Sequence, residues 1–478
     1  MKPLRLVVAL ALVTAALAAT ASSASAASQP LVTGVTNLNP DAPLAFDRVR
    51  QAGARFVRVS LIWSATAVGG TPLEPSNPLD PSYDWSVTDA AVRNASAAGL
   101  TPLVLVEGVP SWAQRCEAPA VVPNAACDPD PAALREFAKA AAAHYSGRVK
   151  GVPEVTYFQA LNEPNLSLYF FPQLETNGNI ISPGLYRDLI NAFYEGVKTV
   201  RPQALVVAAG LGPVFVPKLT VGPLTFTRML LCMQGIQRPR PTKGNCGGPV
   251  HFDIFAIQPY TTGGPNHQGG PNDVTIGDLP KLKALLEAAD RAGRIDGLYQ
   301  RTPLWVTEFS WDSKPPDPNG VPMKILVSWV SEALHNAWQA GVDHFFWFSL
   351  RDEATEGRPT SQTLESGLYF RGPSLEADQP KPILAAFRFP FVAHPGARLE
   401  VWGRTPSSRG GKVRIQVREE GWRTIATVRA AKTGIFEASI ATSYGRNKKG
   451  SVRAVFGGQG SPAFGMKPVP EFEHLPFG

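Results

Sequence analysis

Two glutamates in this chain each follow an apolar, strand-like run. Glu163 follows the run 155–161, and Glu308 follows the run 303–307. A carboxylate at the end of a buried strand is costly to place, because desolvation opposes its charge. Two such groups in one cleft suit chemistry in which one carboxyl is the acid and the other is the nucleophile or base.

The elements that must position these glutamates alternate between strand and helix. Eight apolar strands are predicted to begin near residues 31, 55, 101, 154, 204, 252, 303 and 343. Helical patterns lie at 43–52, 87–98, 131–145, 184–200, 279–292 and 323–340, with weaker helices at 226–235 and 381–387. Such alternation is typical of a parallel sheet, and eight units favour a closed (β/α)8 TIM barrel over an open doubly wound sheet. The sequence has no GxGxxG or GK[ST] motif, which weakens a nucleotide-binding alternative.

After residue 395 the pattern changes to short alternating strands. They are predicted at 399–402, 413–417, 425–428, 435–440 and 452–456, with a hairpin turn at 419–421. This pattern predicts a small antiparallel β-sandwich. The expected organisation is a signal peptide at 1–27, a catalytic barrel at 28–392 and a C-terminal accessory domain at 396–478.

The first residues have the pattern of a targeting segment. Lys2 and Arg5 precede an apolar stretch at 6–19, and small residues at 24–26 offer a cleavage site after Ala26 or Ala27. No later stretch reaches the roughly 18 to 20 apolar residues of a membrane helix. We therefore expect a secreted protein without a membrane span.

The four cysteines are compatible with export. Of the three possible pairings, two local disulfides are the simplest, Cys116 with Cys127 and Cys232 with Cys246. Free buried thiols are the alternative. Neither pair has CxxC spacing or nearby histidines, so no metal site is predicted, and the sequence indicates no cofactor.

The net charge of +7 is concentrated in the C-terminal part. Residues 396–478 carry 14 Lys and Arg against 6 Asp and Glu, whereas the rest of the chain carries 32 against 33. Such a segment could attract an anionic surface or polymer, or could be the solvated face of a β-domain. No nucleic-acid motif is present, so no nucleic-acid partner is expected, and a monomer is the default.

In a (β/α)8 barrel the functional residues lie at the C-terminal ends of the strands. Both glutamates fall at such ends, on the fourth and seventh strands. Other residues with suitable chemistry share this position: Arg58 and Trp63 on the second strand, Glu107 and Trp112 on the third, Gln258 and Tyr260 on the sixth, and Trp347 on the eighth.

These residues resemble the motifs of the clan A retaining glycoside hydrolases, and in particular of families 5 and 39. The resemblance spans roughly residues 30–390. It is carried by Asn162-Glu163-Pro164, Thr307-Glu308-Phe309, Val57-Arg58, Pro259-Tyr260, Trp347 and the segment 108–113. It implies that Glu163 is the acid/base and Glu308 the nucleophile. Gln258 departs from the pattern, because many relatives carry histidine there.

The resemblance also implies roles around the two carboxyls. Arg58 and Tyr260 would keep Glu308 ionised, and Asn162 would bind the sugar hydroxyl beside the anomeric carbon. Aromatic platforms for sugar rings are expected from Trp347, Trp63, Trp112 and Trp311. Arg58 as a structural barrel residue, and the tryptophans as core residues, are the alternatives.

The expected function is a secreted retaining glycoside hydrolase that cleaves O-glycosidic bonds of a polysaccharide or oligosaccharide by double displacement. A carbohydrate-binding barrel without catalysis is one alternative. A transglycosylase that uses the same residues is another.

Overall fold

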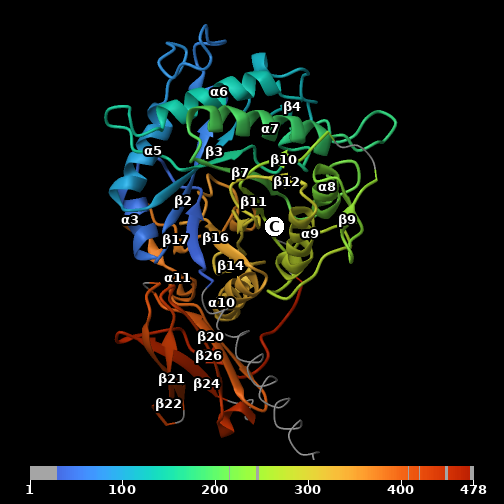
Figure 1. Ribbon diagram of the computed structural model, residues 1–478. Helices are drawn as coiled ribbons and strands as arrows, with labels where there is room; N and C mark the ends of the chain where they lie inside the picture. Colours follow the sequence, from blue (N-terminus) through green and yellow to red (C-terminus); the bar gives the residue numbers. More distant parts are fainter. Residues whose placement is uncertain are drawn as a thin grey trace, which may run out of the picture. The chain divides into compact units, whose positions relative to one another are not determined.

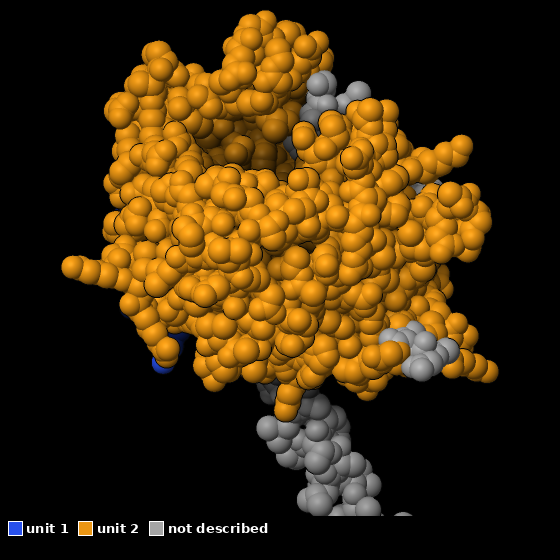
Figure 2. Space-filling view, turned by 90° about the horizontal axis from the view of Figure 1, so that it is seen from above, with its two compact units in different colours: residues 1–31, 385–469 blue, residues 32–384, 470–478 orange. Residues whose placement is uncertain are grey.

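The computed structural model describes residues 29–214, 216–243, 247–406, 408–418, 420–446 and 450–473 (Figure 1). The predicted signal peptide and Cys246 lie outside these ranges. The described chain divides into two compact units (Figure 2). One comprises residues 32–384 and 470–473, and the other comprises residues 29–31 and 385–469.

The larger unit is built on a closed barrel of eight parallel strands, as the alternating pattern predicts. Their order around the barrel is β1-β16-β13-β11-β7-β5-β3-β2. The strands are β1 (Val32–Thr36), β2 (Phe56–Ile62), β3 (Thr101–Glu107), β5 (Tyr157–Ala160), β7 (Leu205–Leu211), β11 (Ile254–Ile257), β13 (Leu304–Val306) and β16 (Val342–Phe348).

Helices follow the strands close to the predicted positions (Figure 1). They are α3 (Pro43–Gln51), α4 (Trp63–Thr66), α5 (Ser86–Ala97), α6 (Pro131–His144), α7 (Ser182–Val200), α8 (Pro223–Leu230), α9 (Leu279–Arg291), α10 (Met323–Gln339) and α11 (Pro382–Arg388). The start of α6 shows why the sequence marks it: Asp130 accepts a hydrogen bond from Ala132 N at 2.8 Å, and Pro131 occupies the first turn. Within the described ranges no helix combines the length and apolarity that crossing a membrane requires.

One apolar cluster fills the interior of the barrel. Six strands contribute buried side chains to it, and the other two contribute the half-buried Val32 and Tyr157. Trp305 stacks on His344 with ring centroids 4.0 Å apart, and its ring packs edge-on against Phe56 at 5.6 Å. The cluster makes the barrel a packed core, which gives the strand ends a rigid base.

The loops of the larger unit carry short paired strands. The pairs are β4 (Ala126–Cys127) with β6 (Phe170–Phe171), β8 (Met233–Gln234) with β9 (Arg240–Pro241), β10 (Val250–His251) with β12 (Ile295–Asp296), β14 (Ser313–Lys314) with β15 (Val321–Pro322), and β17 (Tyr369–Phe370) with β18 (Gln379–Pro380).

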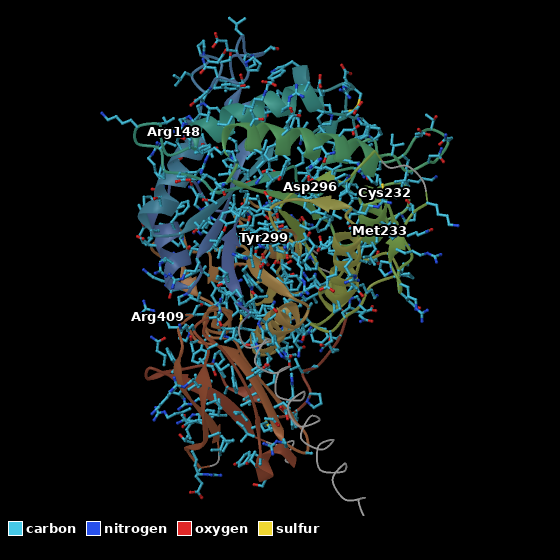
Figure 3. The ribbon with its side chains drawn as sticks, in the orientation of Figure 1. Arg148, Cys232, Met233, Asp296, Tyr299 and Arg409 are labelled. Atoms are coloured by element: carbon cyan, nitrogen blue, oxygen red, sulfur yellow. A yellow bond between two sulfur atoms is a disulfide. The ribbon has the colours of Figure 1, made fainter. Side chains whose placement is uncertain are left out.

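The predicted disulfide between Cys116 and Cys127 is confirmed, and it pins the loop between β3 and α6. Cys232, which lies just after α8 and is labelled in Figure 3, is also disulfide-bonded. Its predicted partner, Cys246, lies outside the described residues.

The smaller unit contains two antiparallel sheets, in agreement with the predicted β-sandwich. One sheet comprises β19 (Phe391–Pro395), β20 (Leu399–Arg404) and β23 (Ile435–Ile440); the other comprises β22 (Trp422–Ala430), β21 (Gly411–Arg418), β24 (Ser451–Phe456), β25 (Gln459–Gly460) and β26 (Phe464–Gly465). Within this unit the buried Arg404 donates to the carbonyls of Leu31 and Phe387 at 3.0 and 3.1 Å. These bonds tie residue 31 to the C-terminal segment.

Candidate active site

A cavity of about 690 Å³ lies at the C-terminal ends of the barrel strands. Residues from the ends of six strands line it, namely Thr36, Glu107, Glu163, Tyr260, Glu308 and Phe348. Viewed from above, the surface of this unit is visibly hollowed (Figure 2). The cavity therefore occupies the position that the barrel architecture assigns to function.

Glu308 is held by a cation and a hydroxyl. It forms an ion pair with Arg58 Nη1 through Oε1, and Tyr260 Oη donates to its Oε2 at 3.1 Å. Arg58 lies within β2 and Tyr260 follows β11, so side chains from two other barrel units fix the carboxyl that follows β13. Both partners favour the ionised form of Glu308.

The same arginine organises the residue before Glu163. Arg58 Nη2 donates to Asn162 Oδ1 at 2.7 Å, and Gln258 Nε2 donates to the same oxygen at 2.8 Å. Arg58 Nε donates to Gln159 Oε1 at 2.9 Å. Two donors on one oxygen fix the orientation of the Asn162 amide, so its NH2 group is the end that can donate to a ligand.

Glu163 lies on a sharply bent backbone against the end of β7. Its φ is +43°, in the left-handed region that side chains other than glycine rarely adopt, and its N–H donates to Gly210 O at 3.2 Å. A Cβ at Gly212 would lie 2.9 Å from Glu163 Oε1, so the glycine lets the carboxyl lie against the backbone. The bent backbone at Glu163 and the space left by Gly212 therefore both determine where the Glu163 carboxyl lies.

Asn165 and Tyr186 brace this bend. Asn165 donates to the carbonyls of Gly212 and Val221 at 3.1 and 3.0 Å, and accepts from Gly212 N at 2.8 Å. Tyr186 Oη donates to Ala160 O at 3.0 Å and accepts from Ala209 N. Four of these five contacts join the fourth and fifth barrel units, and the bond from Tyr186 to Ala160 lies within the fourth, so the loop that carries Glu163 is locked to the end of β7.

Burial raises the pKa of both carboxyls, but their different partners shift the two pKa values apart. Burial raises the pKa of Glu163 well above its usual range, and the charge of Glu308 raises it further, while Arg58 opposes both effects. Burial also raises the pKa of Glu308, but the Arg58 guanidinium and the Tyr260 hydroxyl lower it. Glu163 therefore keeps its proton to higher pH than Glu308, which is the division an acid and a nucleophile require.

The structure brings together five of the predicted site residues: Arg58, Asn162, Glu163, Tyr260 and Glu308 all line the cavity, and Glu107 lines it as well. The tryptophans do not. Trp63, Trp311 and Trp347 are fully buried, and the half-buried Trp112 packs edge-on against Trp63 at 5.6 Å without reaching the cavity.

The prediction of sugar platforms is therefore wrong for the fully buried Trp63, Trp311 and Trp347, and their contacts explain why. Trp63 stacks on Phe137 of α6 at 4.7 Å. Trp347 Nε1 donates to Ser366 O at 2.8 Å, and Trp311 Nε1 donates to Gly263 O at 3.0 Å. Each ring thus anchors a loop or helix behind the cavity wall.

Sequence reasoning missed several residues of the site. Gln159 is fully buried inside β5, and a polar side chain within an apolar strand was the signal for it. Phe348, at the end of β16, lines the cavity, whereas the preceding Trp347, which was predicted to do so, does not. Other missed residues lie on loops, and no pattern marked them: Leu166, Leu168, Tyr169, His267 and Asp273. In the described part of the chain, no cluster of three potential metal ligands lines the cavity.

No protein-family model matches this sequence, and a search of curated proteins found no match. Solved structures do resemble it. One is a family 39 glycoside hydrolase from Bacteroides cellulosilyticus WH2, with a TM-score of 0.53, 17% identity, and coverage of 87% of this chain and 80% of that chain.

Two further structures of family 39 enzymes are similar. The enzyme from Xanthomonas axonopodis pv. citri has a TM-score of 0.50 and 17% identity over 88% of this chain and 94% of that chain. A β-xylosidase from Caulobacter crescentus has a TM-score of 0.51 and 17% identity over 81% of this chain and 83% of that chain. At this identity the likeness establishes the fold, and it confirms the predicted resemblance at that level.

Proposed function

We propose that the chain is a retaining glycoside hydrolase in which Glu163 is the general acid/base and Glu308 the nucleophile. One observation carries the proposal: the buried Glu163 after β5 and the half-buried Glu308 after β13 line one cavity, and Arg58 and Tyr260 both bond to Glu308. The resemblance to family 39 enzymes in fold supports it.

In the first step a Glu308 oxygen attacks the anomeric carbon, and the bond from that carbon to the leaving oxygen breaks. Glu163 gives its proton to the leaving oxygen. In the second step Glu163 takes a proton from water, whose oxygen displaces Glu308 from the anomeric carbon. The raised pKa of Glu163 suits the first step, and the ion pair of Glu308 with Arg58 keeps the nucleophile charged.

Asn162 and Arg58 have supporting roles in this proposal. The Asn162 oxygen accepts from Arg58 and Gln258, so its NH2 group is left to donate to the sugar hydroxyl beside the anomeric carbon. Arg58 connects the two halves of the site, because it bonds to both Glu308 and Asn162.

We also propose that the enzyme acts outside the cell. The proposal rests on the N-terminal pattern of Lys2, Arg5, the apolar stretch 6–19 and the small residues at 24–26, together with the disulfide between Cys116 and Cys127. Mass spectrometry of protein exported by the native host would test it, and a mature N-terminus near residue 27 is expected.

The catalytic assignment is tested with a panel of aryl glycosides and three variants. Glu308→Gln should abolish hydrolysis of every glycoside that the wild type cleaves. Glu163→Ala should lose about 10² to 10⁴ of kcat/KM on glycosides with poor leaving groups, and much less on 2,4-dinitrophenyl glycosides, whose leaving group needs no proton. Glu107→Gln, which changes another carboxyl of the same cavity, is the matched control and should keep the wild-type dependence on the leaving group.

Products decide the mechanism. Azide should restore turnover of Glu163→Ala, because it can displace Glu308 without a general base. The first sugar released by the wild type should keep its anomeric configuration by NMR. Unchanged activity of Glu308→Gln would favour a barrel whose catalysis, if any, lies elsewhere. Sugar transfer in place of hydrolysis at high acceptor concentration would favour a transglycosylase.

A further inference from the structure

The lining of the cavity differs between its two carboxyls. Around Glu308 the lining includes polar side chains as well as the apolar Phe348 and Leu364: Tyr260 bonds to Glu308, and the adjoining Thr261 Oγ1 bonds to His267 Nδ1 at 2.6 Å. The cavity beside Glu163 is lined instead by apolar side chains from the loops that follow β5 and β7.

Leu166 lies directly beside the Glu163 carboxyl. A Cβ at Gly212 would be 2.9 Å from Glu163 Oε1 and 2.7 Å from Leu166 Cδ1, so both side chains border the same point on the backbone. Pro213 and Val214 follow Gly212 and also line the cavity. Leu166, Pro213 and Val214 therefore form a wall beside Glu163 whose side chains offer methyl and ring carbons and no hydrogen-bonding groups.

Leu168 and Tyr169 extend this wall toward solvent. Their side chains are 56% and 39% exposed, and both line the cavity. The backbone on either side of Leu168 is held by hydrogen bonds: Ser167 N donates to Leu219 O at 2.8 Å, and Tyr169 O accepts from Ala126 N at 2.9 Å. When a ligand covers apolar groups that are held rigidly at the mouth of a cavity, their removal from water makes the free energy of binding more favourable.

The apolar wall also has a polar edge. Val274 N donates to Pro213 O at 2.9 Å, and this contact brings Asp273 and Thr275 of the next loop to the cavity. No tryptophan in the described ranges lines the cavity, so broad aromatic platforms for a row of sugar rings are missing there.

We propose that the enzyme cleaves glycosides whose leaving group is apolar, an alkyl chain or an aromatic ring, in preference to a bond between two sugars. The inference rests on the proposed function, because it assigns the leaving group to the Glu163 side and the reacting sugar to the Glu308 side. Leu166, Leu168, Tyr169, Pro213 and Val214 form the leaving-group site.

The size of the preference follows from the area that the leaving group buries. Each methylene that becomes buried is worth about fourfold in affinity, but a chain lying against one wall buries only part of its surface. We therefore expect an octyl glycoside to exceed the matching disaccharide in kcat/KM by roughly 10- to 100-fold. Octanol is not a better leaving group than a sugar hydroxyl, so such a preference reports binding rather than intrinsic reactivity.

The experiment uses the full chain and the sugar and anomeric configuration that the aryl glycoside panel identifies. For that sugar, kcat/KM is measured on the octyl glycoside and on the disaccharide with glucose as the leaving group. Leu168→Ser should lower the value for the octyl glycoside about 5- to 20-fold and leave the disaccharide nearly unchanged. The matched control is Leu298→Ser, since Leu298 is 52% exposed and precedes β13, away from the cavity.

The outcomes separate the two proposals. An octyl preference that falls in Leu168→Ser and persists in Leu298→Ser supports the apolar leaving-group site. Hydrolysis that depends on Glu308 but favours the disaccharide overturns the apolar site and leaves the glycosidase proposal intact. An octyl preference that Leu168→Ser does not reduce also overturns the assigned wall. If no glycoside is cleaved, the proposed function fails, and the inference fails with it.

Discussion

Replacing Tyr260 with phenylalanine should shift one limb of the pH–rate profile and not the other. The change removes the hydroxyl that donates to Glu308 Oε2 at 3.1 Å, and leaves the buried ring in place. The proposed mechanism requires Glu308 ionised and Glu163 protonated, so kcat/KM should follow a bell whose acidic limb reports Glu308 and whose alkaline limb reports Glu163.

The size of the shift can be worked from the lost hydrogen bond. A hydrogen bond to a charged group contributes about 1.5–3 kcal/mol, and one pKa unit corresponds to about 1.4 kcal/mol. The hydroxyl stabilises the carboxylate form, so its loss raises the pKa of Glu308. The acidic limb should therefore move up by about one to two pH units. The bell narrows, because the alkaline limb stays in place.

The assay is kcat/KM of an aryl glycoside across the pH range for the wild type, Tyr260→Phe and Tyr169→Phe. Tyr169 lines the same cavity beside Glu163, so Tyr169→Phe is the matched removal of a phenolic hydroxyl and should leave the acidic limb in place. An acidic limb that Tyr260→Phe does not move, or a shift of the alkaline limb alone, would refute the assignment of Glu308 as the group that must be ionised.

Three further sets of substitutions test the scaffold of the site. Lys381 is fully buried and donates to Asp352, Ser313 Oγ and Glu365 O, so Lys381→Met should cost about 3–5 kcal/mol of unfolding free energy in urea titrations, and adding Asp352→Asn should recover part of the loss. Gly212→Ala should lower kcat/KM by at least tenfold on glycosides with poor leaving groups and by less on glycosides with activated leaving groups, because the added Cβ would press on the Glu163 carboxyl. Equal losses on the two kinds of glycoside would argue against that cause. Cys116→Ser together with Cys127→Ser should lower stability by about 2–4 kcal/mol while kcat on a small glycoside stays near wild type, as thermal unfolding and initial rates would show.

The barrel was predictable because its signals are local. Each buried parallel strand is a short apolar run, and helices such as α6 begin at turn and proline residues that read directly from the sequence. The positions of Glu163 and Glu308 followed, since parallel strands bring their C-terminal ends to one side of the barrel. Arg58 and Tyr260 were found for the same reason.

The tryptophans show where such reasoning stops. A tryptophan at a strand end can face the cavity or turn behind it, and the choice depends on partners far along the chain, such as Phe137 for Trp63 and Ser366 for Trp347. The apolar wall could not be predicted either, because Leu168 and Tyr169 owe their positions to backbone pairing between two loops. The division of the chain at 392–396 stays a prediction.

The positive φ of Glu163 means that the substitution that would best stabilise this loop is one that removes its carboxyl. The left-handed conformation costs a residue with a side chain about 1–2 kcal/mol of stability, whereas glycine adopts it at almost no cost. A laboratory screen that selects for heat resistance alone would therefore favour glycine at this position, which removes the proposed acid. If Glu163 is the acid, as proposed, a more stable enzyme requires that residue 163 stay fixed and that stabilising substitutions be made elsewhere, because glycine at this position would remove the group that the reaction needs.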